Sequence, residues 1–504
     1  MYILSCKDVY KMESDAQNNY NISETILMEN ASAALFHFIK NTADKNSKII
    51  ILAGPGNNGG DGFVLMRHLI TNGYNADLYY PVQNNKYGKA AESNLNILNN
   101  LNIHIYDLST LNNLDKYDII IDALFGIGLT RNISGIYKDI IEKANNTNAL
   151  KIAVDIASGL ISDSSEVPEC VFKADYTITF STLKYCHTLY PAKTYSGKVI
   201  TANITIPDNI ISQYKHNIFI DEYNKPILKN RPQDSHKGTY GKVAVVGGSI
   251  EMAGAVKIAA SSALHSGCGL ITLCHPNTLN RNFISDIPEI MTKSFDYNEP
   301  ALICDYINNS ATVYTIGNGM GRQENVKDFI LYILQNTLKP VVIDADAINA
   351  LSLNELNNIQ SEVIMTPHLA EFARLINKDI NEIKKDKVSL AKEFADNYSI
   401  HLILKSAETI IAVPNDKVYI LNTGNTALSK GGSGDALCGL TASLLAQGYS
   451  LKDTCILAAY ILGKSAEKAV EKNNPACLSI TQIINYYNEV FNEFWIHFKM
   501  WRRY

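Results

Sequence analysis

The sequence lacks three features that would place the protein at a membrane or on nucleic acid. No hydrophobic run reaches the ~18 residues that a membrane-spanning helix needs, so we predict no contact with a membrane. The first residues lack a basic segment followed by a long apolar run, which argues against a signal peptide. Basic residues are not in excess, since the formal net charge is −5, and no concentrated basic stretch stands out. We therefore expect no nucleic-acid partner.

Cysteine is present without a pattern. The nine cysteines form no CxxC pair and no Cys/His cluster at metal-ligand spacing. We therefore expect reduced thiols in a cytoplasmic protein. The 504 residues exceed what one hydrophobic core holds, so we expect at least two domains of ~100–200 residues each. A hydrophobic content of 46% and a charged content of 19% are typical of a globular protein.

The clearest chemical signal is the stretch Gly431-Gly432-Ser433-Gly434-Asp435, which a run of small apolar residues follows. The run predicts a helix, and the free N–H groups at a helix N-terminus bind phosphate. Asp435 lies in the first turn, where the helix dipole favours the ionised carboxylate. A phosphate-binding loop beside a carboxylate base can transfer a phosphoryl group to a hydroxyl. The alternative is a plain glycine-rich loop with a capping acid, because short glycine motifs are often false positives.

The first half of the sequence predicts a doubly wound α/β domain. We expect a helix over residues 22–40, a strand over 48–53, a glycine loop over 54–62 and a helix over 63–73. The loop contains Asn57 and Asn58, whose side chains both donate and accept hydrogen bonds. They suit a ribose-phosphate and a hard cation, and a tight structural turn is the alternative.

Two acids end neighbouring predicted strands in this half. Asp122 closes the strand over residues 118–122, and Asp155 closes the strand over 151–155. The carboxyl ends of parallel strands meet at one edge of a sheet, so we expect both acids near Asn57 and Asn58. Carboxylate and amide oxygens together form a cation site or an acid/base site. Taken singly, each acid could be a helix cap.

Residues 206–233 lose the strand and helix periodicity and collect three prolines, which indicates a boundary near 210–230. We assign residues 1–215 and 230–504 to two domains, with 216–229 as the linker. Beyond the linker, short strands that end in glycine or polar residues alternate with helices. This pattern predicts a second α/β domain with a mainly parallel sheet.

Several motifs of the second half, taken in order, resemble the ADP-dependent NAD(P)H-hydrate dehydratases of the ribokinase-like superfamily. These motifs are His236-Lys237-Gly238, Gly247-Gly248-Ser249, Gly317 to Gly321, Asp344 to Asn349, Thr366-Pro367-His368 with Glu371 to Leu375, and Gly431 to Asp435. The first half resembles NAD(P)H-hydrate epimerases through its Asn-Asn-Gly-Gly-Asp-Gly loop and the strand ends at Asp122 and Asp155. Both halves in this order resemble the bifunctional nicotinamide-nucleotide repair enzymes. The resemblance implies a Rossmann-like three-layer α/β/α sandwich followed by a ribokinase-like α/β/α domain.

For the second domain, the resemblance implies repair of NADH or NADPH that carries water across a ring double bond, with a hydroxyl at C6. Asp435 would take the proton of that hydroxyl while it attacks the β-phosphate of ADP, and loss of phosphate would leave AMP and the restored ring. Mg²⁺ would accompany the ADP. The implied nucleotide-binding residues are Lys405, Ser406, Ala407, Glu408, Thr409 and Gly434, and the implied substrate-binding residues are Ala255, Gly319, His368 and Asp435.

For the first domain, the resemblance implies interconversion of the R and S hydrates, so that both epimers become usable by the second domain. Asp155 would be the acid/base group, assisted by Lys184. Asn58, Asp122 and Ser158 would bind a potassium ion. The implied substrate-binding residues are Asn57, Asn58, Gly59, Gly60, Asp61, Gly126, Ile127, Gly128, Leu129, Thr130, Arg131, Asn132 and Asp155.

The sequence departs from the family pattern in three places. Ser406 stands where family members usually have Gly, Ser429-Lys430 replaces Ala-Thr before the glycines, and Tyr185-Cys186-His187 replaces Pro-Gly after Lys184. The first two leave the preference between ADP and ATP open. A small-alcohol kinase with a non-catalytic N-terminal ligand-binding module is the alternative function. In either case we expect small-molecule ligands and a homo-oligomer.

Overall fold

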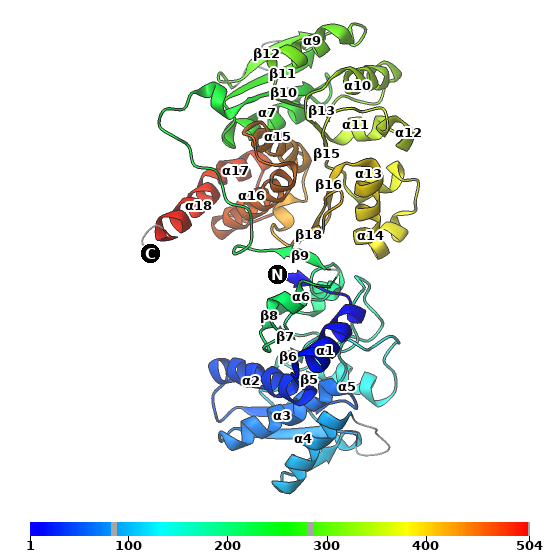
Figure 1. The fold of residues 1–504 in the computed structure, drawn as a ribbon, viewed down its shortest axis with the longest axis vertical. Helices are drawn as coiled ribbons and strands as arrows, with labels where there is room; N and C mark the ends of the chain where they lie inside the picture. The colour runs from blue at the N-terminus through cyan, green and yellow to red at the C-terminus, as the bar shows by residue number, and fades with distance from the viewer. Residues whose placement is uncertain (82–87, 215, 280–286, 502–504) are drawn as a thin grey trace. The chain divides into compact units, whose positions relative to one another are not determined.

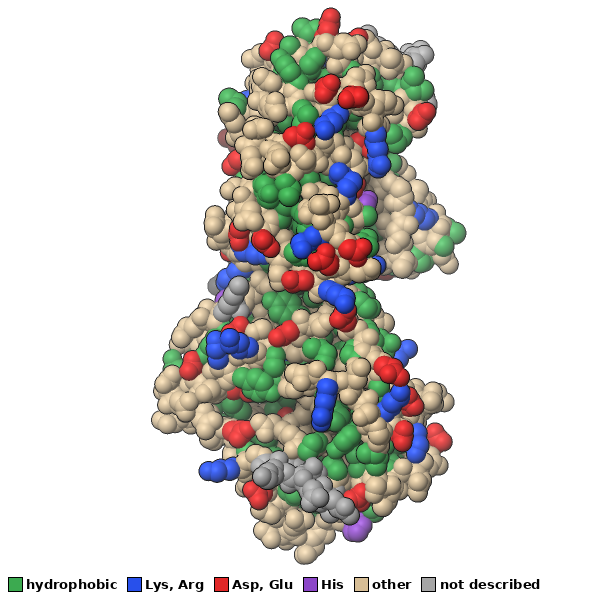
Figure 2. Space-filling model, turned by 90° about the vertical axis from the view of Figure 1, so that its right-hand side faces the viewer, with side chains coloured by type: hydrophobic (Ala, Val, Ile, Leu, Met, Phe, Trp, Pro, Cys, Tyr) green, Lys and Arg blue, Asp and Glu red, His purple; other side chains and the backbone are tan. Residues whose placement is uncertain are grey.

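The computed structural model describes residues 1–81, 88–214, 216–279 and 287–501. These residues form two compact units, Met1–Phe219 and Ile220–Tyr504 (Figure 1). Among the described helices, none combines the length and the apolar character needed to cross a membrane. All nine cysteines lie in the described ranges and are free thiols. On the face that Figure 2 shows, acidic and basic side chains are interspersed rather than gathered by sign.

The first unit is built on a seven-stranded sheet in which every pair of neighbouring strands is parallel. The strand order is β4-β3-β2-β5-β6-β7-β8. The bounds are β2 Lys48–Ala53, β3 Asn75–Tyr80, β4 Ile105–Asp107, β5 Ile119–Ala123, β6 Leu150–Val154, β7 Tyr176–Phe180 and β8 Lys198–Ala202. A short strand β1 (Tyr2–Ile3) pairs antiparallel with β9 (Asn217–Ile220).

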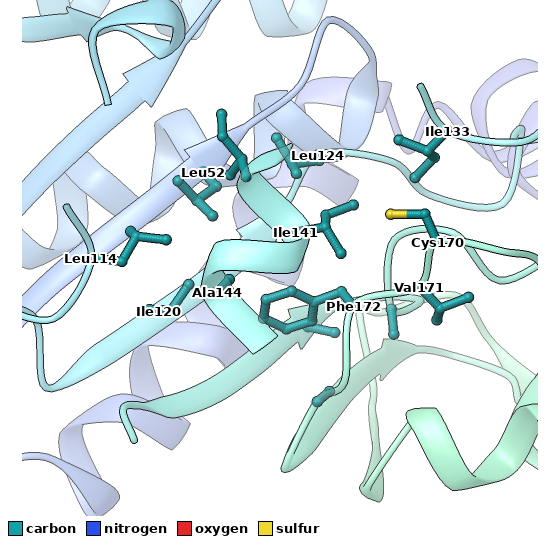
Figure 3. Close-up of a cluster of buried hydrophobic side chains, with 14 of the residues drawn as sticks. Leu52, Leu114, Ile120, Leu124, Ile133, Ile141, Ala144, Cys170, Val171 and Phe172 are labelled. Carbon is teal, nitrogen blue, oxygen red and sulfur yellow. The ribbon is translucent and has the colours of Figure 1, made fainter. Parts of the chain in front are cut away.

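Successive side chains of a strand point to opposite faces of the sheet, so the apolar strands of this unit make both faces hydrophobic. Helices cover both faces. Ile50 belongs to the cluster of buried side chains on one face, in which Phe172 and helix α5 (Ile136–Asn145) take part (Figure 3). Its neighbours Ile49 and Ile51 belong to the opposite cluster. That cluster includes residues of α2 (Glu24–Thr42), α3 (Asn57–Thr71) and α4 (Lys89–Asn100). The remaining α-helices of this unit are α1 (Cys6–Tyr20) and α6 (Asp208–Ile211).

The second unit contains a mixed sheet with the strand order β18-β17-β16-β15-β14-β13-β10-β11-β12. The strands from β12 to β16 are parallel to their neighbours, and β17 and β18 are added antiparallel. The bounds are β10 Lys242–Gly247, β11 Leu270–Pro276, β12 Met291–Phe295, β13 Val313–Asn318, β14 Val341–Ile343, β15 Val363–Met365, β16 His401–Lys405, β17 Thr409–Ala412 and β18 Val418–Leu421.

The helices of this unit include the long C-terminal series that the sequence predicts. The bounds are α7 Ala253–His265, α9 Pro300–Ser310, α10 Glu324–Asn336, α11 Ala345–Ala350, α12 Leu353–Leu356, α13 Leu369–Leu375, α14 Ile380–Tyr398, α15 Ser433–Ala446, α16 Leu451–Lys472, α17 Ile480–Asn485 and α18 Tyr487–Trp501. Helix α15 packs against α7, where the Ser262 hydroxyl donates to the carbonyl of Ala436 at 2.6 Å. The predicted fold class, two α/β units each built on a largely parallel sheet, is confirmed.

Two local predictions are corrected. Helix α1 was not expected, and α3 begins at Asn57 rather than Phe63. Residues 57–61 therefore form the first turn of a helix and not a loop. The backbone N–H groups of residues 57–59 are at the helix N-terminus, whereas the Gly60 N–H already donates to the Gly56 carbonyl at 3.2 Å.

Candidate active site

The glycine motif of the second unit, Gly431 to Asp435, lines a cleft of about 480 Å³. Gly432 is the N-cap of α15 and has φ = 96°, a left-handed conformation that glycine adopts without strain. A Cβ at this position would also lie 2.7 Å from the Cγ2 atom of Ile480. The backbone N–H groups of residues 433–435 are at the helix start, where they have no partner within the helix. The cleft thus has an anion-binding end.

Asp435 lies on this first turn, half-buried, at the wall of the cleft. Its Oδ1 accepts a hydrogen bond from Asn318 Nδ2 at 2.8 Å. Burial raises the pKa of the Asp435 carboxyl to about 6, and the nearby charge of Asp344 adds to that rise. The hydrogen bond from Asn318 and the Lys405 ammonium act in the opposite direction. A carboxyl with a pKa near neutrality accepts a proton more readily than an ordinary aspartate does.

Lys405 and Asp344 form an ion pair beside Gly434, in which the Asp344 side chain is buried and the Lys405 side chain is 23% exposed. Lys405 Nζ donates to Asp344 Oδ1 at 3.0 Å, and the Thr366 hydroxyl donates to the same oxygen at 2.7 Å. Burial alone would lower the pKa of Lys405, but the charges of Asp344 and Glu371 and the hydrogen bond to Asp344 together outweigh burial and raise that pKa. Lys405 is therefore a fixed positive charge that faces the cleft, where it suits a phosphate.

The predicted residues of the second domain do not all lie on the cleft. Those that line it are His368, Lys405, Ser406, Thr409, Gly434 and Asp435. Ala255 and Gly319 lie beside each other, since a Cβ on Gly319 would come within 3.0 Å of the Ala255 Cβ. The Glu408 side chain is buried and paired with Lys387 of α14, so its carboxylate is not among the cleft groups. His368 caps α13, with Nδ1 accepting from the N–H groups of Ala370 and Glu371 at 3.1 Å.

In the first unit, Asp155 follows β6 and has φ = 61°, an uncommon conformation for a residue with a side chain. Its Oδ1 is ion-paired with Lys184, which is only 1% exposed. The Thr179 hydroxyl donates to the same carboxylate oxygen at 2.9 Å and accepts from Lys184 Nζ at 2.8 Å. Burial would raise the pKa of Asp155, but the charge and hydrogen bond of Lys184, with smaller contributions from His187 and Thr179, together hold that pKa below its usual range. Asp155 is therefore ionised at neutral pH and can act as a base.

The expected potassium ligands belong to three neighbouring strand ends: Asn58 follows β2, Asp122 lies in β5 and Ser158 follows β6. The Ser158 hydroxyl donates to Asp122 Oδ1 at 2.6 Å, and the Ser158 N–H donates to Asp122 Oδ2 at 2.7 Å. Asn58 lies against Gly126, whose Cβ, if present, would be 3.4 Å from the Asn58 Cβ. The Asn58 side-chain nitrogen is buried without a hydrogen-bond partner among the described residues. Since amide oxygen and nitrogen interchange on rotation, the unsatisfied Asn58 amide can present its oxygen to a ligand. Among the described residues, no group of three or more His, Cys, Asp or Glu side chains is placed to hold a metal ion.

A second cleft, of about 250 Å³, lies between α1 and the start of α3. Asn57 and Asp61 line it, as do Tyr10 and Glu13 of α1. Burial raises the pKa of Glu13 to about 7, and burial with the Asp155 charge raises the pKa of Asp61 well above its usual range. The predicted segment 126–132 also lies against α1, because Cys6 Sγ donates to the carbonyl of Ile127 at 3.1 Å.

Three polar residues of these sites, Glu13, Asn318 and Asp344, were not predicted from the sequence. Glu13 lies on the helix that was not expected, where no strand end or glycine motif marks it. Asn318 stood inside a quoted motif, Gly317 to Gly321, and Asp344 began another, but neither was given a role. A polar residue at the carboxyl end of a parallel strand was the signal that could have identified Asn318.

Fold and site together define a class. The chain is a two-unit α/β enzyme whose second unit has the parts for phosphoryl transfer: amides at a helix N-terminus, a lysine and a carboxylate base. Its first unit has a buried Asp155–Lys184 ion pair at the carboxyl end of β6. Comparison with known proteins agrees: residues 243–488 match the family model described as NAD(P)H-hydrate dehydratase, and residues 24–186 match the model described as YjeF-related protein N-terminus.

Whole-length relatives identify the family. The bifunctional NAD(P)H-hydrate repair enzyme of Dictyoglomus turgidum is 33% identical over 482 residues, covering 92% of this chain and 93% of the relative. The enzyme of the same name from Moorella thermoacetica is 30% identical and covers 96% of each chain. A crystal structure of the Bacillus subtilis ADP/ATP-dependent NAD(P)H-hydrate dehydratase, co-crystallised with ATP/Mg²⁺, is 29% identical, with a TM-score of 0.49, and covers 53% of this chain and 95% of its own. The chain belongs to the family of bifunctional NAD(P)H-hydrate repair enzymes, so the predicted family and the predicted pairing of epimerase and dehydratase are confirmed.

Proposed function

We propose that the protein repairs hydrated NADH and NADPH in two steps. The first unit interconverts the R and S hydrates, and the second dehydrates the S hydrate while it converts ADP to AMP and phosphate. The observation that carries this proposal is the Asp435 carboxylate on the amide-rich first turn of α15, inside a cleft with room for a nucleotide diphosphate.

In the dehydration step, Asp435 takes the proton of the C6 hydroxyl while the oxygen of that hydroxyl attacks the β-phosphorus of ADP. The oxygen–phosphorus bond forms while the bond from phosphorus to the bridging oxygen breaks, which releases AMP. The N–H groups of residues 433–435 and the Lys405 ammonium stabilise the charge on the transferred group. The C6–O bond then breaks and phosphate leaves. Loss of a proton from the neighbouring ring carbon restores the double bond.

Magnesium would enter this cleft with the nucleotide. The Asp344 carboxylate is already engaged by Lys405, Thr366 and Asn318. Within the described ranges, no cluster of three or more His, Cys, Asp or Glu side chains could hold a metal ion. Mg²⁺ commonly binds substrate phosphates and water with few protein ligands, which fits this donor set. The bound cation would neutralise phosphate charge. The use of ADP as the phosphoryl donor stays a prediction, and the preference between ADP and ATP is left open.

In the epimerisation step, Asp155 takes the proton of the C6 hydroxyl as the bond from C6 to the ring nitrogen breaks, which leaves an aldehyde, and it passes that proton to the ring nitrogen. Attack of the nitrogen on the opposite face of the aldehyde re-forms the bond with inverted configuration at C6, and the proton returns to the oxygen. Lys184 holds the Asp155 carboxylate in place and ionised. Asn58, Asp122 and Ser158 would hold a potassium ion, whose charge would fix the ribose-phosphate end of the substrate at the start of α3. Residues 57–61 and 126–132 would surround that substrate. The free thiols of all nine cysteines support the cytoplasmic location that we predict, and the homo-oligomer stays a prediction.

Two single variants test the two steps separately. With Asp435→Asn, we expect recovery of NADPH absorbance from mixed hydrates and ADP to fall by about 10²–10⁴-fold, the usual loss of a general base. The same variant should still equilibrate the two hydrates, as followed by chromatography. Asp155→Ala should still dehydrate the S hydrate with ADP but should no longer equilibrate the two hydrates. If Asp435→Asn recovers NADPH as fast as the parent, the mechanism is wrong. If ADP consumption instead yields a stable phosphorylated product, the protein is a small-alcohol kinase.

A further inference from the structure

Asn318, the last residue of β13, occupies an unusual position between two carboxylates. Its side chain is 0% exposed. The amide nitrogen Nδ2 lies 2.8 Å from Asp435 Oδ1 and 3.2 Å from Asp344 Oδ2. A primary amide has two N–H donors, so one group can satisfy both acids at once.

The amide oxygen of Asn318 has its own partner. Cys438, one turn after Asp435 on α15, donates its thiol proton to Asn318 Oδ1 at a sulfur–oxygen distance of 3.3 Å. Burial raises the pKa of this thiol well above its usual range, so the sulfur stays protonated and remains a donor. The thiol therefore favours the orientation in which the amide NH₂ faces the carboxylates and the oxygen faces away.

We infer that Asn318 is a positioning residue for the proposed base Asp435, and that Cys438 sets the orientation of Asn318. The Asn318 amide forms a hydrogen-bonded bridge from Asp435 Oδ1 to Asp344 Oδ2 and holds Asp435 Oδ1 in place. No described residue donates a hydrogen bond to Asp435 Oδ2. That second oxygen is left to take the substrate proton. The inference rests on the proposed function, because it needs Asp435 to act as the base.

The charges around Asp435 show why the bridge matters. Asp344 and Asp346 both disfavour the ionised form of Asp435, whereas the Lys405 ammonium favours it. Hydrogen bonds to a carboxylate stabilise its charged form. Without the Asn318 amide, Asp435 would face Asp344 with no donor between them, and it would ionise only at higher pH.

The first test is Asn318→Leu, which keeps the approximate shape of the side chain and removes both donors. We expect the acid limb of the pH profile of kcat/KM for dehydration to move up by about one pH unit relative to the parent. The deficit should shrink as the pH rises, and the KM for ADP should stay close to that of the parent. Ionisation of ADP affects both proteins equally and cancels in the comparison. A uniform loss at every pH with the acid limb unmoved would overturn the inference.

A second pair of variants applies if Asn318→Leu does not fold. Cys438→Ser keeps a proton donor beside the Asn318 oxygen, so its acid limb should coincide with that of the parent. Cys438→Val removes the donor, and its acid limb should move in the same direction as that of Asn318→Leu. Cys455→Val, in the buried part of α16, is the control for enlarging a buried cysteine and should move nothing. Equal acid limbs for Cys438→Ser and Cys438→Val would contradict the inference.

The outcomes separate this inference from the proposed function. If the parent protein recovers no NADPH from its hydrates with ADP, the proposed function fails. If the parent is active and Asp435→Asn is not, while the acid limb stays in place in Asn318→Leu and in Cys438→Val, only the inference fails.

Discussion

Lys184→Met should destabilise the first unit strongly at neutral pH and much less in acid. The Lys184 ammonium is 1% exposed and the Asp155 side chain 13%, so the substitution leaves a buried carboxylate without its counter-charge. Removing one partner of a buried ion pair typically costs about 3–5 kcal/mol. Asp155 keeps the hydrogen bonds from the Thr179 hydroxyl and the Phe180 N–H, so we expect the lower end, about 3 kcal/mol.

The sign of the pH effect follows from the Asp155 carboxyl. In the parent, its pKa in the folded state is lowered, so its stabilising contribution is present above the unfolded pKa of about 4 and is lost as the pH falls through the folded value. In the variant, burial without Lys184 raises the folded pKa above the unfolded one. The variant then takes up a proton on folding, and its deficit relative to the parent should shrink from neutral pH towards about pH 4.

The assay must report on the first unit alone. Both tryptophans, Trp495 and Trp501, belong to the second unit, so tryptophan fluorescence is unsuitable. Hydrogen exchange of peptides from β6 and β7, read by mass spectrometry, reports local unfolding of the strands around Asp155. Lys184→Met combined with Asp155→Asn removes both charges and should recover most of the lost protection. Lys138→Met, which removes a surface ion pair with Glu169, is the control and should change little.

Two results would refute this reasoning. Lys184→Met could lose the same protection at neutral and acidic pH, which would mean that the loss comes from packing and not from charge. The double variant could also be as unstable as Lys184→Met alone, which would mean that the Asp155 charge is not the source of the cost.

Three further predictions concern the other groups. The dehydration rate of the parent should rise through about pH 6 as Asp435 ionises, and a rate that is flat between about pH 5 and pH 8 would contradict the assigned base. Gly432→Ala should lower the melting temperature, because φ = 96° and the nearby Ile480 oppose a side chain. Gly431→Ala, with open space around its Cβ, should leave the melting temperature unchanged, and an equal loss of stability in both variants would argue against the turn geometry. Ser158→Ala should weaken the dependence of hydrate epimerisation on added KCl, with choline chloride as the control for ionic strength, and an unchanged KCl dependence would argue against the cation position.

The regular parts of the fold were predictable because strand alternation and glycine punctuation are local signals. The strands that end at Asp122 and Asp155 and the helix after Asp435 lie where the sequence placed them. Helix α1 was missed because it buries few apolar side chains, chiefly Val9, Met12 and Ala16, among many polar ones. Such a helix owes its stability to tertiary packing more than to its own sequence.

The start of α3 and the Asn318 bridge depend on contacts that sequence reasoning does not show. Glycines at 59, 60 and 62 disfavour a helix, but at Gly59 the backbone passes so close to the carbonyl of Gly54 that a Cβ would lie 2.0 Å away. Close approach of the chain therefore outweighs helix propensity. Asn318 and Asp435 are 117 residues apart, and no local pattern links them. The acids at neighbouring strand ends were predictable because sheet topology alone brings them together.

The most direct test of the account is a phosphorus balance on the dehydration reaction. The purified S hydrate of NADPH is incubated with ADP, Mg²⁺ and the full-length protein, and the products are quantified by chromatography. We expect AMP, free phosphate and NADPH to form in equal amounts, because the phosphoryl group transferred to the C6 hydroxyl leaves as phosphate when the ring double bond is restored. Accumulation of a phosphorylated hydrate without NADPH, or recovery of NADPH without consumption of ADP, would contradict it.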